Sequence, residues 1–88
     1  MARYEVSFRP SADRALRRSP VDVQRRIVLA VADLADEPRP PGVVKLAGGD
    51  NLWRIRVGVY RAVYEIHDNR LVVLVLRVAH RKDVCRRG

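Results

Sequence analysis

Three arginines near the middle of the chain are spaced so that they can bind one phosphate group. Arg54, Arg56 and Arg61 lie in segment 52–66, in which apolar and polar residues alternate before and after Gly58. This alternation predicts two strands joined by a two-residue turn with glycine first, as in a type II′ hairpin. In that register Arg56 faces Arg61, and all three arginines share one face of the hairpin.

This arrangement lowers stability unless an anion binds to it. Like charges that face each other across a strand pair destabilise the pair by about 0.2–1 kcal/mol, and a phosphate group between Arg56 and Arg61 would remove that cost. The planar guanidinium also suits two-pronged contacts with phosphate oxygens. The alternative is that these arginines only keep the outer face of a sheet hydrated. Three arginines on one face with few acids beside them favour the phosphate site.

The other face of the hairpin is apolar and is expected to be core. Its members are Trp53, Ile55, Val57, Tyr60, Ala62, Tyr64 and Ile66. We therefore interpret the three aromatic residues as core side chains rather than as platforms for stacked bases.

The net charge points to an acidic or polyanionic partner. The 88 residues contain 18 Lys and Arg against 10 Asp and Glu, a formal charge of +8, and every basic residue except Lys45 and Lys82 is arginine. The summed field attracts nucleic acids and acidic proteins alike. A chain of this length is expected to form one domain, 1–88.

Other features of the composition favour a cytoplasmic protein without membrane contact. The single cysteine, Cys85, allows no disulfide within the chain, and it is interpreted as a passive tail residue rather than a nucleophile. No signal peptide is recognisable, and no apolar run is long enough to span a bilayer. No His, Cys or carboxylate cluster has metal-ligand spacing, so neither a metal nor another cofactor is expected.

The first part of the chain predicts a strand followed by two helices. Residues 3–9 alternate in the manner of a strand. Ser11 is expected to cap a short helix, and Ser19 with Pro20 to begin a second, amphipathic helix that runs to Leu34.

The remainder predicts three antiparallel strands. Segment 36–42 contains three prolines, which can neither continue a helix nor pair inside a sheet. The hairpin follows, and the uninterrupted apolar run 71–76 is typical of a strand in the middle of a sheet. The predicted fold class is α+β: strand, helix, helix and three antiparallel strands, forming one sheet with two helices packed on one face.

Two histidines and one carboxylate are candidates for moving a proton. His80 is expected at the edge of the arginine site, where the surrounding positive charge disfavours the imidazolium and leaves a neutral base. Glu65 shares the arginine face, where an ion pair with Arg54 or Arg56 is the alternative to a role as a base. His67 is expected in a solvated turn.

These features together resemble the RelE/ParE superfamily of bacterial type II toxins over nearly the whole chain. The most specific stretches are 46–48 (LAG), 52–64 (LWRIRVGVYRAVY) and 78–84 (VAHRKDV). The resemblance implies a RelE-like messenger RNA endoribonuclease, a hydrolase that cuts in the ribosomal A site without a metal. The ribose 2′-hydroxyl attacks the scissile phosphate, and a 2′,3′-cyclic phosphate results.

The resemblance also assigns site residues. RelE-like members hold the scissile phosphate with a basic pair on the second strand, the arginine of a Tyr-Arg step and a basic residue after the last strand. With His80 added from the argument above, the predicted catalytic residues are Arg56, Arg61, His80 and Arg81. The predicted phosphate- and RNA-binding residues are Arg54, Arg56, Arg61, Lys82 and Arg86.

The chain departs from the family pattern at three places. Arg54 and Arg56 stand where RelE-like enzymes often carry lysines, and an arginine cannot give up its proton in a protein. Val59 replaces a frequent aspartate in the turn. Cys85 replaces the aromatic residue usual near the carboxy terminus, which removes a stacking platform or hydroxyl from the site.

The resemblance implies two kinds of partner and leaves two alternatives open. A cognate acidic antitoxin would cover the basic groove and carry any contact with operator DNA, and messenger RNA on the ribosome, with ribosomal RNA contacts, would be the target. A ParE-like inhibitor of DNA gyrase is the first alternative. The second is a degenerate, non-toxic binding module.

Overall fold

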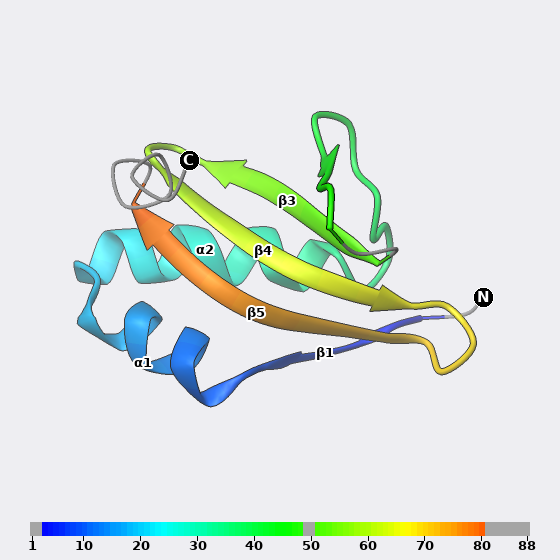
Figure 1. Ribbon diagram of the computed structural model, residues 1–88. Coiled ribbons are helices and arrows are strands. Elements are labelled where there is room, and N and C mark those ends of the chain that lie inside the picture. Colours follow the sequence, from blue (N-terminus) through cyan, green and yellow to red (C-terminus); the bar gives the residue numbers. More distant parts are fainter. Residues whose placement is uncertain (1–2, 49–50, 81–88) are drawn as a thin grey trace.

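The computed structural model describes residues 3–48 and 51–80, which form one sheet with two helices on one of its faces (Figure 1). The elements in chain order are β1 (Glu5–Phe8), α1 (Pro10–Arg18), α2 (Val21–Asp33), β2 (Val44–Lys45), β3 (Leu52–Val57), β4 (Tyr60–His67) and β5 (Val72–His80). This is the α+β architecture that the sequence predicts, with one additional short strand.

The sheet is mixed, and the apolar run near the end of the chain lies inside it. The strand order is β1-β5-β4-β3-β2, with β1 parallel to β5 and the other neighbours antiparallel. Because β5 is covered by helices on one face and flanked by strands on both edges, a nearly continuous apolar sequence suits it. The predicted central position of this strand is confirmed.

The additional strand, β2, is missed by the sequence prediction because it is only two residues long. Val44 pairs with Arg54, and Lys45 pairs with Trp53. Within the described residues, β2 therefore leaves residues 55–57 of β3 unpaired on that edge, which becomes important for the site.

The core lies between the two helices and the helix-facing side of the sheet. It takes Ala12, Leu16, Ile27 and Val31 from the helices, Leu34 from the end of α2, and Ile55, Ala62, Tyr64, Ile66, Val73, Val75 and Val78 from the strands. Burying each aliphatic side chain of this kind stabilises the fold by about 1.5–3 kcal/mol. Trp53 and Tyr60 pack against the cluster, so the interpretation of the hairpin aromatics as core residues is confirmed.

The first helix begins earlier than predicted. α1 starts at Pro10 with Arg9 in the capping position, and no side chain caps it. The fixed φ of proline is suited to the first helical turn, where its missing N–H costs nothing. Ser11 therefore lies inside the helix, and its predicted role as the cap is wrong.

Ser19 ends the first helix rather than capping the second. Its hydroxyl donates a hydrogen bond to the carbonyl oxygen of Ala15 at 3.0 Å, and its backbone N–H donates to that of Leu16 at 3.0 Å. α2 begins at Val21, with Pro20 in the capping position and no side-chain cap. The predicted Ser19 cap is therefore also wrong.

The part of the chain that the structure describes contains no helix long and apolar enough to cross a membrane.

Candidate functional site

The hairpin has the predicted register. Val57 pairs with Tyr60 across the turn, and Arg56 pairs with Arg61. Gly58 has φ +63°, the left-handed conformation that the first central residue of a type II′ turn requires and that glycine adopts without strain. Since paired residues point to the same side of the sheet, both arginines face away from the helices.

All three arginines of the hairpin line one pocket of about 520 Å³. Its lining comprises Ala30 and Asp33 from α2, Pro40, Pro41 and Gly42 from the proline-rich connector (residues 36–42), Val44 from β2, and Arg54, Ile55, Arg56 and Arg61 from the hairpin. The pocket lies beside the β3 edge that β2 leaves open. A groove between this edge and the proline-rich connector is thus bordered by three guanidinium groups.

These guanidinium groups are not neutralised by the protein's own acids. Among the described residues, the ion pairs involve Arg3, Arg17, Arg39 and His67, and none of them involves the three pocket arginines. Asp33 also lines the pocket, but its carboxylate makes no ion pair within the described part of the chain. The pocket therefore combines three positive charges with one negative charge at its wall, a field that attracts an anion.

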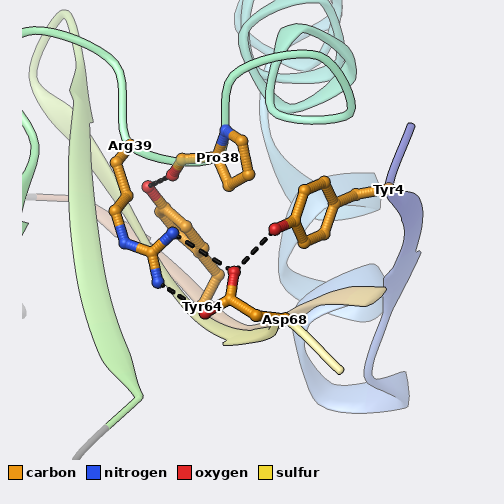
Figure 2. A network of polar contacts seen from close by, with 5 residues as sticks. All are labelled: Tyr4, Pro38, Arg39, Tyr64 and Asp68. Atoms are coloured by element: carbon orange, nitrogen blue, oxygen red, sulfur yellow. Dashed lines mark hydrogen bonds and ion pairs between the residues drawn. The ribbon is translucent and has the colours of Figure 1, made fainter. Parts of the chain in front are cut away.

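The connector that forms one wall of the pocket is tied down by a polar network (Figure 2). Two guanidinium nitrogens of Arg39 donate to the carboxylate of Asp68 at 2.9 and 3.3 Å, and the Tyr4 hydroxyl donates to the same carboxylate at 2.6 Å. The buried Tyr64 hydroxyl donates to the Pro38 carbonyl oxygen at 2.8 Å. These bonds join the connector to β4 and to the turn after it, and they join that turn to Tyr4, the residue before β1.

The pKa values of Asp68 and Tyr64, two members of this network, depart from their usual values. Hydrogen bonds from Arg39 and then from Tyr4 lower the pKa of Asp68 below its usual value. Burial raises the pKa of Tyr64 to about 12. Asp68 therefore stays ionised in moderately acidic solution, and Tyr64 stays protonated in moderately alkaline solution.

The Trp53 ring contacts a cation of the connector and a cation of β2. The Arg39 guanidinium lies 5.0 Å from the centre of the indole ring, and the Lys45 ammonium lies 5.8 Å from it. Cations at such distances are attracted to the ring face. Trp53 is therefore both a core residue and a contact surface for the Arg39 guanidinium.

The structure separates His80 from the arginine pocket. His80 pairs with Tyr60, and the two rings meet edge to face with their centres 5.3 Å apart. Arg61, the next residue, instead pairs with Ala79. His80 therefore lies on the helix-facing side of the sheet, opposite to the side predicted from its neighbours in sequence. Its role as a base stays a prediction that this register does not favour.

Glu65 and His67 contact each other rather than the arginines. The His67 ring nitrogen Nε2 and the Glu65 carboxylate are 2.9 Å apart, and both side chains are half-buried. The expected ion pair of Glu65 with Arg54 or Arg56 is wrong, and so is the expectation of a merely solvated His67. Both residues lie in β4, two positions apart, which places them on the same face of the strand.

Several predicted residues lie outside the described residues, and sequence reasoning missed others. Arg81, Lys82, Cys85 and Arg86 belong to the first group. The missed ones are Asp33 and the connector residues Pro40, Pro41 and Gly42. The spacing of Ala30 and Asp33 on one helix face was the available signal, but the register of that face against β3 depends on the packing of α2.

Within the described ranges, no group of three or more His, Cys, Asp and Glu side chains gathers to hold a metal ion.

The five-stranded mixed sheet and its helix pair define a class of small α+β proteins that includes solved RelE toxins. The archaeal RelE–RelB complex from Pyrococcus horikoshii OT3 contains a chain that superimposes with a TM-score of 0.80 at 30% identity, over 92% of this chain and 97% of that one. The RelBE2 toxin–antitoxin complex of Mycobacterium tuberculosis gives a TM-score of 0.79 at 31% identity, over 89% and 98% of the two chains.

Sequence comparison identifies the family. Residues 6–84 match the family described as ParE toxin of type II toxin-antitoxin system, parDE, and the chain belongs to this family. Toxin RelG of Mycobacterium tuberculosis is 38% identical in an alignment of 88 positions that covers 96% of this chain and 98% of RelG. The predicted membership of the RelE/ParE superfamily, with a RelE-like character, is confirmed.

Proposed function

We propose that this protein is the toxin of a type II toxin–antitoxin system and acts in the cytoplasm as a ribosome-dependent messenger RNA endoribonuclease. The observation that carries the proposal is the pocket in which Arg54, Arg56 and Arg61 come together without a partner among the described residues. Such a cluster is costly for folding and useful for gripping a phosphodiester.

The chemistry would be an internal transfer at phosphorus. The ribose 2′-oxygen forms a bond to the phosphorus while the bond to the 5′-oxygen breaks, and a 2′,3′-cyclic phosphate and a 5′-hydroxyl result. The 2′-hydroxyl loses a proton, and the leaving 5′-oxygen gains one. Guanidinium groups aimed at the phosphate stabilise the charge that develops in the transition state, which is commonly the largest catalytic contribution.

Arg61 is expected to contribute most to this stabilisation. It is half-buried and faces Arg56 on the neighbouring strand, whereas Arg56 itself is exposed. Neither arginine can serve as a base. Alignment of the message by the ribosome would supply the remaining advantage, because correct positioning lowers the barrier to reaction.

The partners proposed for this chain are an acidic antitoxin and the ribosome with its message. Several of the structural relatives were solved as complexes of a toxin with its antitoxin, and a net charge of +8 favours an acidic protein partner. Contacts with operator DNA would be made through the antitoxin.

Brief induction in a bacterial host, followed by mapping of RNA 5′ ends, tests the proposal. The unaltered protein should produce new ends within translated messages, and Arg61→Ala should reduce them at least about 100-fold. Arg70→Ala, which removes an exposed arginine from the turn after β4, should change little. An Arg61→Ala protein that is folded, equally expressed and fully toxic would refute the assignment.

A ParE-like inhibitor of DNA gyrase is the second candidate, because the matching family bears the name of the ParE toxin. It would give a DNA-damage response on induction without new RNA ends. A degenerate binding module would give neither effect. The unpartnered arginines favour the nuclease, since a pure binder has no need for a set of phosphate-gripping groups.

His80→Gln tests the proton-transfer role separately. Because the register turns this residue toward the helices, we expect the variant to keep at least about a tenth of the cleavage rate, against the 10²–10⁴-fold loss typical for removal of a general base.

A further inference from the structure

A β-bulge moves one more arginine onto the arginine face of the sheet. Tyr64 pairs with Val75, but the preceding residue, Val63, pairs with Arg77, so Leu76 is left as an extra residue on β5. Strict alternation from Val75 would have turned Arg77 toward the helices. Bulges of this kind often occur beside functional sites, where they re-aim a side chain.

The burial pattern agrees with this change of side. Val73 and Val75 are buried before the bulge, and Val78 is buried after it. Buried positions are thus two residues apart up to Val75 and three apart across the bulge. Arg77 consequently points to the face that carries the arginines of the hairpin.

Arg77 lies one row of side chains away from Arg56 and Arg61, which face each other across the hairpin. Val63 pairs with Arg54 on one side and with Arg77 on the other, while Arg61 pairs with Arg56 and with Ala79. Arg77 is thus the diagonal neighbour of Arg61. Diagonal positions on adjacent antiparallel strands are about 7–8 Å apart, within reach of long side chains. The basic surface therefore extends from β3 across β4 to β5.

This fourth arginine is not used by the protein's own acids. Within the described residues, no ion pair or hydrogen bond involves the Arg77 side chain, and the nearest acid on its face by register, Glu65, contacts His67. Arg77 is only half-exposed in spite of its charge. The bulge keeps the charge of Arg77 out of the core and buries Val78 in its place, and it leaves the outward-facing arginine without an acid partner among the described residues.

We propose that Arg77 binds a backbone phosphate of the RNA next to the one held by Arg56 and Arg61, so that the arginine face holds at least two successive phosphates. The proposal rests on RNA being the ligand, as proposed above. It assigns Arg77 to substrate positioning, outside the group of arginines that grip the scissile phosphate.

Salt dependence of RNA binding tests this assignment, because each phosphate contact to a single strand steepens the slope of log K against log salt by about 0.7. The probe is a single-stranded oligonucleotide with 2′-O-methyl groups at every position, which cannot be cleaved. The full-length protein would be compared with Arg77→Gln, Arg61→Gln and Arg70→Gln between about 50 and 200 mM salt.

We expect Arg77→Gln to weaken binding about tenfold and to reduce the slope by about 0.7. Arg77→Lys should restore the slope, because it restores the charge. Arg70→Gln, the control, should leave the slope unchanged, since Arg70 lies in the turn at the far end of β4.

The outcomes separate this proposal from the one on which it rests. A reduced slope for Arg61→Gln with an unchanged slope for Arg77→Gln would refute the role of Arg77 alone. If neither variant differs from the Arg70→Gln control, RNA is not bound at this face, and both proposals fail. Circular dichroism and thermal unfolding of each variant exclude loss of fold as the cause.

Discussion

Replacing Arg56 by glutamine should stabilise the fold while it impairs function. Arg56 faces Arg61 directly, and no acid among the described residues compensates the pair. Removing one charge should therefore relieve a repulsion of about 0.2–1 kcal/mol. Because the Arg56 side chain is exposed, solvent screening keeps the expected gain below the upper end of this range, at about 0.5 kcal/mol.

The gain is large enough to measure. For a domain of 60–100 residues, 1 kcal/mol shifts the melting temperature by about 4–8 °C, so about 0.5 kcal/mol should raise it by about 2–4 °C. Added salt should diminish the difference, since the Debye length falls from about 30 Å at 0.01 M to about 3 Å at 1 M. Thermal unfolding followed by circular dichroism at these two salt concentrations is the assay.

Arg70→Gln is the matched control, because it lowers the net charge by the same amount without removing a facing arginine. Its melting temperature should differ from that of the unaltered protein by less than that of Arg56→Gln does. If Arg56→Gln melts at or below the temperature of the control at low salt, the facing arginines do not repel each other appreciably, and the reasoning that links them to an anion is refuted.

Three further predictions concern the pocket and its wall. Asp33→Asn should tighten binding of uncleavable RNA about two- to fivefold, as expected for loss of about 0.5–1 kcal/mol of repulsion; titration at low salt would show whether it instead weakens binding. Asp68 has a lowered pKa, so its contribution to stability is complete above the ordinary value of 3.8 and is lost as the pH falls below it; Asp68→Asn should flatten this decline in melting temperature. Burial raises the pKa of Tyr64 from 10.0 to about 12, so the fold loses stability as the pH rises between these two values. Tyr64→Phe should remove this alkaline decline in melting temperature but cost about 1–3 kcal/mol at neutral pH, because the Pro38 carbonyl loses its donor. An unchanged alkaline decline would contradict the role of burial.

The hairpin was predictable because its evidence is local. Alternation assigns each side chain to a face, and a glycine at the turn sets the pairing of Arg56 with Arg61. The match between prediction and structure therefore extends from the turn to Trp53 and Tyr64, where both strands are regular.

The remaining parts depend on contacts that a sequence pattern does not contain. The bulge at Leu76 falls inside an apolar run, where every residue is compatible with either face, so alternation cannot locate it. This shift is also why His80 and Arg77 occupy the faces opposite to those that simple alternation from Val75 predicts. The connector that forms one wall of the pocket is positioned by the contacts of Arg39 with Asp68 and Trp53, which lie far from it in the sequence. No local sequence pattern predicts such long-range pairing.

The most direct test of the central claim is cleavage of a defined message on purified ribosomes. The full-length protein would be mixed with ribosomes that hold one chosen codon in the A site. A parallel reaction would contain the Arg61→Gln variant in place of the unaltered protein. The account predicts a cut within that codon that leaves a 2′,3′-cyclic phosphate and a 5′-hydroxyl, and its loss with Arg61→Gln. An intact message with the unaltered protein, or equal cleavage by both proteins, would contradict it.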